Sequence, residues 1–125
     1  MHGKCGHYLG TEVEGKWWKR YSKDGFFARG NGEYWYDDHA FYFLCYLTRE
    51  PITIPFDKIT ALRVGTWHAG RWVWGKPIIK VLWVHQGQTL SSGFILSYDK
   101  REALRIFDEI RQQVAAANAG SQAKG

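Results

Sequence analysis

Residues Gly25–Ile59 read GFFARGNGEYWYDDHAFYFLCYLTREPITIPFDKI, and this stretch decides the fold class. It contains the short apolar runs FFA, EYWY, AFYFLCYL and ITIPF, and Gly, Asp or Pro separates each run from the next. Short apolar runs between turn-forming residues are typical of a β-meander, in which consecutive strands pair in antiparallel order. The stretch therefore predicts a mainly β fold, and it contains no pattern that predicts a reaction.

The runs predict alternating strands and turns, with strands over Phe26–Arg29, Glu33–Tyr36, Ala40–Leu47 and Ile52–Ile54 and turns at residues 30–32, 37–39 and 48–51. The long run Ala40–Leu47 is expected to be buried on both faces. Adjacent aspartates in a turn commonly accept backbone N–H bonds, which is the role expected of Asp37 and Asp38. Pro55 limits pairing, so its strand is expected at an edge or a bend. A bulge or a single helical turn near Asp57 would explain the broken alternation after it.

The composition fits one domain with its own core, because the chain has 125 residues, 45% of them apolar and 17% aromatic. A formal net charge of +5 leaves room for an anionic partner. Cys45 lies in the apolar run FYFLCYL and is expected to be buried, while Cys5 lies among glycines. We expect both to be free thiols in a reducing compartment. We find neither a membrane-spanning run nor a signal peptide, so a cytoplasmic location is expected.

The first residues of the chain, Met1–Glu14, contain three glycines and show no clear period, which predicts a loose lead-in. His2, Cys5 and His7 are metal-ligand types that lie close together in it. A structural zinc site needs four ligands, and no second cluster supplies the fourth. We therefore interpret this segment as a polar end without a metal, and we expect no cofactor elsewhere.

The segment Gly15–Asp24, GKWWKRYSKD, combines two tryptophans with four cations. Its periodicity leaves open whether it forms an extra strand or a short helix. One interpretation is an anion-binding patch for phosphates or bases, formed by Lys16, Lys19, Arg20 and Lys23. The other, which we favour, is structural, with the tryptophans covering one end of a barrel and the cations in solvent.

The stretch Gly65–Lys76, GTWHAGRWVWGK, is the second aromatic and basic segment, and no carboxylate occurs between Asp57 and Asp99. It supplies a candidate interaction surface made of Trp67, His68, Arg71, Trp72, Trp74 and Lys76. Tryptophan and arginine are over-represented among residues that dominate binding energy. The alternative is a twisted hairpin whose tryptophans fill the core, and the sequence leaves both open.

The last third of the chain predicts a hairpin and then a helix. Pro77–His85 and Thr89–Ser97 read as strands around a tight turn at residues 86–88. From Asp99 the period changes to that of a helix over about 99–117, with Asp99 as its N-terminal cap. The expected apolar stripe consists of Ala103, Leu104, Phe107, Ile110 and Val114.

These elements resemble the pleckstrin-homology (PH)-like superfold, and most closely the GRAM-like and bacterial PH-like domains. The resemblance rests on Gly32, the aromatic strands 34–36 and 41–43, the words Ile54-Pro55-Phe56 and Ile59, Gly87, and the helix from Asp99. It implies a bent barrel of about seven antiparallel strands capped by one C-terminal amphipathic helix. We accordingly predict a partly flexible lead-in over 1–24, a PH-like domain over 25–117 and a disordered tail over 118–125.

The resemblance implies a binding module, since PH-like barrels host lipid, peptide and protein ligands. We find no nucleophile elbow, P-loop, HExxH or CxxC motif, so we predict that the chain is not an enzyme. The favoured function is protein–protein interaction or self-association through the aromatic and basic surface. The alternative is peripheral binding to anionic lipid headgroups, or less readily to nucleic acid, through the Lys/Arg and Trp patches.

Overall fold

The computed structural model describes the backbone of residues 4–13, 16–20, 30–46, 48, 51–65, 67–68, 71–72 and 77–124. It describes the side chains of residues 4–13, 30–46, 48, 51–65 and 77–119. The predicted strand Phe26–Arg29 lies outside the described residues.

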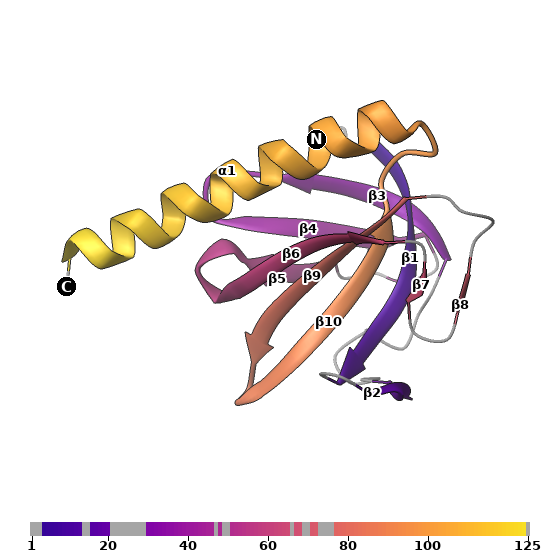
Figure 1. Cartoon of the computed structure of the whole chain (residues 1–125), viewed down its shortest axis with the longest axis horizontal. Helices are drawn as coiled ribbons and strands as arrows, with labels where there is room; N and C mark the ends of the chain where they lie inside the picture. Colours follow the sequence, from indigo (N-terminus) through magenta and orange to yellow (C-terminus); the bar gives the residue numbers. More distant parts are fainter. Residues whose placement is uncertain are drawn as a thin grey trace.

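The described strands form one antiparallel sheet of eight strands and a separate two-stranded hairpin. Seven strands of the sheet follow one another in the order β5-β4-β3-β1-β10-β9-β6, and β2 pairs with β1 outside this path. Figure 1 shows the helix α1 crossing one open side of the curved sheet. The bounds are β1 Lys4–Val13, β2 Lys16–Arg20, β3 Gly30–Tyr36, β4 Ala40–Cys45, β5 Ile52–Pro55, η1 Phe56–Lys58, β6 Ile59–Gly65, β7 Trp67–His68, β8 Arg71–Trp72, β9 Ile78–His85, β10 Gln88–Ile95 and α1 Lys100–Lys124. The predicted mainly β, PH-like architecture is confirmed.

The first strand is the main correction to the sequence analysis. The expected loose lead-in is wrong for Lys4–Val13, which forms β1 in the middle of the sheet between β3 and β10. Its register shifts between Tyr8 and Gly10, where Gly10 adopts a positive φ of 111°. The glycines that made this segment look irregular are thus accommodated by long-range pairing, which local sequence patterns do not show.

The predicted turn at residues 30–32 is also wrong, because these residues open strand β3. Gly6 of β1 lies opposite Gly32, and Gly32 lies opposite Cys45 of β4. A Cβ on Gly32 would lie 2.2 Å from the carbonyl oxygen of Leu44. Glycine is therefore required here for close backbone approach rather than for a turn.

Other local predictions are confirmed. Asp37 Oδ1 accepts the backbone N–H groups of His39 and Ala40, at 2.8 and 2.9 Å. These bonds are the main cause that lowers the pKa of the Asp37 carboxyl. β5 lies at an edge of the sheet, and the helical turn expected near Asp57 is η1.

The core lies between the curved sheet and α1, and the aromatic residues supply much of it. Phe94 is at its centre, with ring centroids 5.0 Å from Phe41, 5.3 Å from Tyr8 and 5.4 Å from Phe43. Cys45 is buried in the same cluster, as expected, and burial raises the pKa of its thiol. Of the described aromatic residues in the stretch 25–59, Tyr34, Phe41, Phe43 and Phe56 thus belong to the core.

A chain of polar side chains crosses this apolar interior. Thr11 Oγ1 lies 2.5 Å from the Tyr8 hydroxyl and 2.6 Å from Ser92 Oγ. Trp83 Nε1 donates to Ser92 Oγ at 3.0 Å. These bonds join β1, β10 and β9, and they satisfy groups that would otherwise be costly to bury.

Helix α1 begins as predicted, because Asp99 Oδ1 accepts the backbone N–H of Arg101 at 2.9 Å. Its apolar face includes four residues of the predicted stripe, Ala103, Phe107, Ile110 and Val114, but not Leu104. Leu104 is 42% exposed, whereas Ile106, absent from the predicted stripe, is 2% exposed and Ile110 is 1% exposed. The helix also continues to Lys124, beyond the expected end at residue 117.

Candidate functional site

A groove of about 240 Å³ runs between strand β6 and the C-terminal half of α1. Its described lining residues are Ile59, Thr60, Ala61 and Leu62 of β6 and Arg111, Val114, Ala115 and Asn118 of α1. Leu62 and Val114 are partly buried and pack against the main core. The floor of the groove is therefore apolar, and its rim carries polar groups from both elements.

Strand β6 ends the sheet on this side. Among the described strands it pairs only with β9, so one edge of its backbone has no strand beside it. An edge strand presents N–H and C=O groups that can pair with another chain. The opposite edge strand, β5, ends in Pro55, which has no N–H to donate. β6 is consequently the better of the two edges for accepting a further strand.

The helical wall of the groove carries the small side chain of Ala115 among larger ones. Ala115 is exposed there, and Asn118 Nδ2 donates to the carbonyl oxygen of Val114 at 3.0 Å. Arg111 lies at the rim, but it forms an ion pair with Asp108 at 2.5 Å. The small side chain of Ala115 leaves room for a backbone to approach α1 closely at that position.

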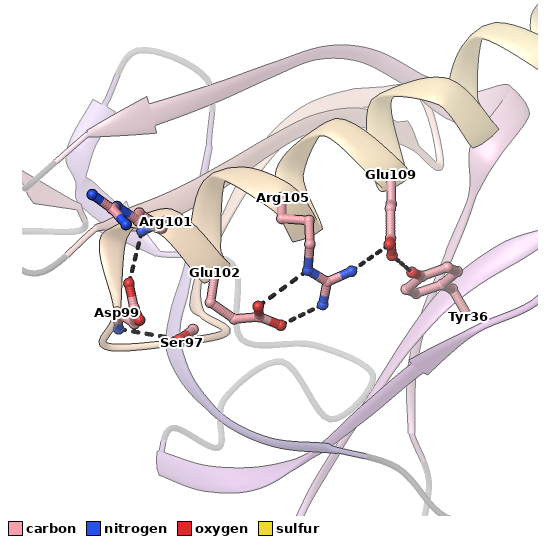
Figure 2. Close-up of polar contacts among 7 residues, drawn as sticks. All are labelled: Tyr36, Ser97, Asp99, Arg101, Glu102, Arg105 and Glu109. Carbon is pink, nitrogen blue, oxygen red and sulfur yellow. Dashed lines mark hydrogen bonds and ion pairs between the residues drawn. The ribbon is translucent and has the colours of Figure 1, made fainter.

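A polar contact joins α1 to strand β3 of the sheet, as Figure 2 shows. The hydroxyl of Tyr36 on β3 donates to Glu109 Oε2. On the helix, Arg105 donates one hydrogen bond to Glu109 Oε1 at 2.5 Å and two hydrogen bonds to the carboxylate of Glu102. Burial, followed by the bond to Glu109, raises the pKa of Tyr36 to about 12. The wall of the groove is therefore held in place from the opposite half of the sheet.

The outer face of the sheet next to β6 carries an unbalanced positive pair. Arg63 of β6 and Lys80 of β9 lie directly opposite each other. Both line a hollow of about 370 Å³, together with Glu12, Val64, Leu82, Thr89, Leu90 and Ser91. In the part of the chain that the structure describes, no carboxylate forms an ion pair with either cation. Like charges directly opposite on paired strands disfavour the sheet, so this pair is a candidate for contact with an anion.

Comparison with known families agrees with this architecture. A family model described as "Bacterial PH domain-like" matches residues 2–111. The chain belongs to this bacterial PH-like family. Its domains are generally binding or interaction modules and are typically non-catalytic. Searches of curated proteins and of solved structures found no match.

A second cavity in this PH-like domain, of about 500 Å³, lies where β1 and the end of β10 separate. Cys5, Tyr46 and Tyr98 line it, and the two tyrosines are 56% and 61% exposed. The Cys5 thiol lies 3.6 Å from the Tyr46 hydroxyl. Among the described lining residues there is neither a base nor a carboxylate to activate the thiol, so we assign the cavity no chemistry.

The structure brings the predicted site residues together only in part. Trp67 and His68 form β7, and Trp72 and Arg71 lie opposite them in β8. Lys16, Lys19 and Arg20 lie on β2, where the backbone register places Arg20 opposite Glu12 of β1. The side chains of these residues, and all of Lys23, Trp74 and Lys76, lie outside the described part of the chain. Both surfaces stay predictions.

Sequence reasoning missed the groove, although it placed both of its walls. The broken alternation over Phe56–Val64 indicated a continuing strand with a bulge or helical turn near Asp57, and the period after Asp99 indicated a helix. Neither pattern shows that β6 ends the sheet or that α1 returns to it. The one sequence signal near the site is the absence of carboxylates from Lys58 to Tyr98.

Two further searches of the described residues gave no site. No group of three or more His, Cys, Asp or Glu side chains in those residues could hold a metal ion. The described part of the chain also contains no helix long and apolar enough to cross a membrane.

Proposed function

We propose that this bacterial PH-like domain is a non-catalytic module that binds an extended segment of a partner protein. The segment pairs with the open edge of β6 and packs against α1. The observation that carries the proposal is that the outer edge of β6 pairs with no other described strand and has an apolar groove beside it. The edge alone would bind any backbone, whereas the groove adds side-chain selectivity.

The two parts of the site supply different contributions to binding. Backbone hydrogen bonds to β6 hold the partner in an extended conformation, so its side chains alternate between the groove and the outer face. Burial of apolar side chains against Leu62 and Val114 supplies the hydrophobic contribution. The fixed position of α1 lowers the ordering cost, because the groove exists before the partner arrives.

The candidate interaction surface Trp67, His68, Arg71, Trp72, Trp74 and Lys76 follows β6 directly in sequence. We propose that it extends the binding site beyond the end of β6 at Gly65. Its backbone hairpin, β7 and β8, supports this, because it starts at Trp67. Exposed tryptophans at that point would anchor a partner that is longer than the groove.

The test is selection of binders from a random peptide library displayed on phage, followed by binding measurements on two matched variants. Ala115 and Ala116 are both exposed on α1, but only Ala115 is among the residues that line the groove. Ala115→Trp should fill the groove and abolish binding, whereas Ala116→Trp should leave binding unchanged. A selection that yields no binders, or binders indifferent to Ala115→Trp, contradicts the proposal.

A second candidate is peripheral attachment to an anionic surface such as acidic lipid headgroups. The observation in its favour is that β2 carries Lys16, Lys19 and Arg20 within five residues. Each cation near an anionic leaflet contributes only about 1 kcal/mol, so several must share one face. Salt-sensitive sedimentation with phosphatidylserine vesicles, lost on changing Lys19 and Arg20 to Glu, would support it. No sedimentation, together with a concentration-dependent mass in solution, would instead indicate self-association.

A further inference from the structure

We infer that the segment bound at β6 alternates apolar and acidic residues, with a carboxylate opposite Arg63. This inference rests on the proposed strand addition and names the class of partner. It follows from the different character of the two faces that an added strand would contact. One face is the groove, and the other continues the outer face of the sheet.

The inner face of β6 selects apolar side chains. Leu62 lies opposite Val81, which is buried in the main core, and Leu62 itself packs against that core. A residue of an added strand beside Leu62 would point the same way, towards Val114 and Ala115 of α1. An apolar side chain fits this position, since it completes a surface that is already apolar.

The outer face selects the opposite character. Arg63 follows Leu62 and so points to the other side of the sheet, as does Lys80, its partner on β9. A residue of the added strand opposite Arg63 would have its Cβ about 5 Å from that of Arg63. A carboxylate there would neutralise Arg63 and reduce the repulsion between Arg63 and Lys80.

The surrounding charges agree with this assignment. The sequence from Lys58 to Tyr98 supplies β6, β9 and β10 and contains no carboxylate. Glu12 lines the same hollow, but from β1, with β10 and β9 between it and β6. Arg111 at the groove rim is ion-paired with Asp108, so we do not count it as a recognition group.

A second copy of the chain is a poor occupant of the same edge. Strand β6 of another copy would bring another Arg63 and no carboxylate. Antiparallel pairing of two β6 strands would therefore add positive charge next to Arg63 and Lys80, which are already positive. The acidic strand is therefore not β6 of a second copy.

The experiment compares three short peptides that alternate valine with glutamate, glutamine or lysine, using fluorescence anisotropy with the full chain. We expect the glutamate peptide to bind at least about fivefold more tightly than the glutamine peptide and the lysine peptide to bind least. Added salt should reduce the advantage of glutamate, because the charges are at the surface.

Charge-reversed variants test whether Arg63 and Lys80 cause the preference for the glutamate peptide. The double variant Arg63→Glu/Lys80→Glu should reverse the preference, so that the lysine peptide binds more tightly than the glutamate peptide. Lys100→Glu/Arg101→Glu changes the net charge equally at exposed positions on α1 and should keep the original preference. Circular dichroism checks that the variants fold. If the double variant Arg63→Glu/Lys80→Glu does not fold, Arg63→Gln replaces it and should abolish the advantage of the glutamate peptide.

The outcomes separate this inference from the proposed function. Equal binding of the glutamate and glutamine peptides, with both blocked by Ala115→Trp, overturns the acidic pattern and leaves strand addition in place. Binding that neither Ala115→Trp nor charge reversal at Arg63 and Lys80 affects overturns both. If both charge-reversed double variants lose the preference for the glutamate peptide equally, the preference depends on net charge rather than on Arg63 and Lys80. That result also overturns the inference.

Discussion

The position of the apolar face of α1 yields the sharpest prediction about the fold. Ile110 is 1% exposed and lies in the main core, whereas Leu104 is 42% exposed on the same helix. Truncating a buried isoleucine to alanine removes apolar contacts and leaves a cavity, which costs about 2–5 kcal/mol. Truncating a half-exposed leucine removes part of its burial energy and should cost about 1 kcal/mol or less.

Urea unfolding followed by tryptophan fluorescence measures both effects. For a chain of this size the free energy of unfolding falls by about 1–3 kcal/mol per molar urea, so Ile110→Ala should lower the midpoint by more than about 1 M. Leu104→Ala, the matched control, should lower it by about 0.5 M or less. Equal shifts in the two variants, or a larger shift for Leu104, would place a different face of α1 on the sheet and refute the reasoning.

Three further predictions test other parts of the fold. Gly32→Ala should destabilise the domain by about 1–3 kcal/mol, because its Cβ would meet the Leu44 carbonyl; an unchanged melting temperature would show that β3 and β4 lie farther apart. Cys5 should react with a maleimide in the folded state while Cys45 reacts only on unfolding, and mass spectrometry showing equal labelling would contradict the burial of Cys45. Burial raises the pKa of Tyr34 from 10.0 to about 12, so unfolded chains ionise this group first and the free energy of unfolding should fall between those pH values. The fall in the free energy of unfolding should be smaller in Tyr34→Phe than in the unchanged chain. Identical pH profiles for the two would contradict the raised pKa of Tyr34.

The parts of the fold that sequence reasoning predicted are those governed by local patterns. The strands of the β9–β10 hairpin show strong apolar runs around a turn at Gln86 and Gly87, both of which adopt positive φ. Asp99 caps α1 through bonds within three residues, and η1 follows directly from Pro55. Such features depend on near neighbours in the chain, so the sequence contains the information.

The parts that were missed depend on contacts between distant segments. β1 contains glycines that disfavour an isolated strand, and it forms because β3 and β10 pair with its two edges. Gly32 looked like a turn residue, yet its role is to admit the backbone of β4. The predicted helix stripe included Leu104 in place of Ile106 because both residues fit an apolar face, and only docking on the sheet selects Ile106.

The candidate site was less predictable than the fold for the same reason. Its walls come from β6 and from the far half of α1, and only the folded chain brings them together. The sequence did indicate the charge that distinguishes the site, through the carboxylate-free stretch, but not that Arg63 and Lys80 lie opposite each other. Pairing register is a tertiary property, so it had to come from the structure.

Amide hydrogen exchange with and without the alternating valine–glutamate peptide tests strand addition at β6 most directly. New backbone hydrogen bonds should slow exchange in Ile59–Gly65, while the other edge strand, Ile52–Pro55, should be unchanged. The C-terminal half of α1 should be protected only slightly, since its amides are already bonded within the helix. Protection confined to residues 16–20 and 67–76, with none in β6, would contradict the account and place the binding surface on the basic and aromatic segments instead.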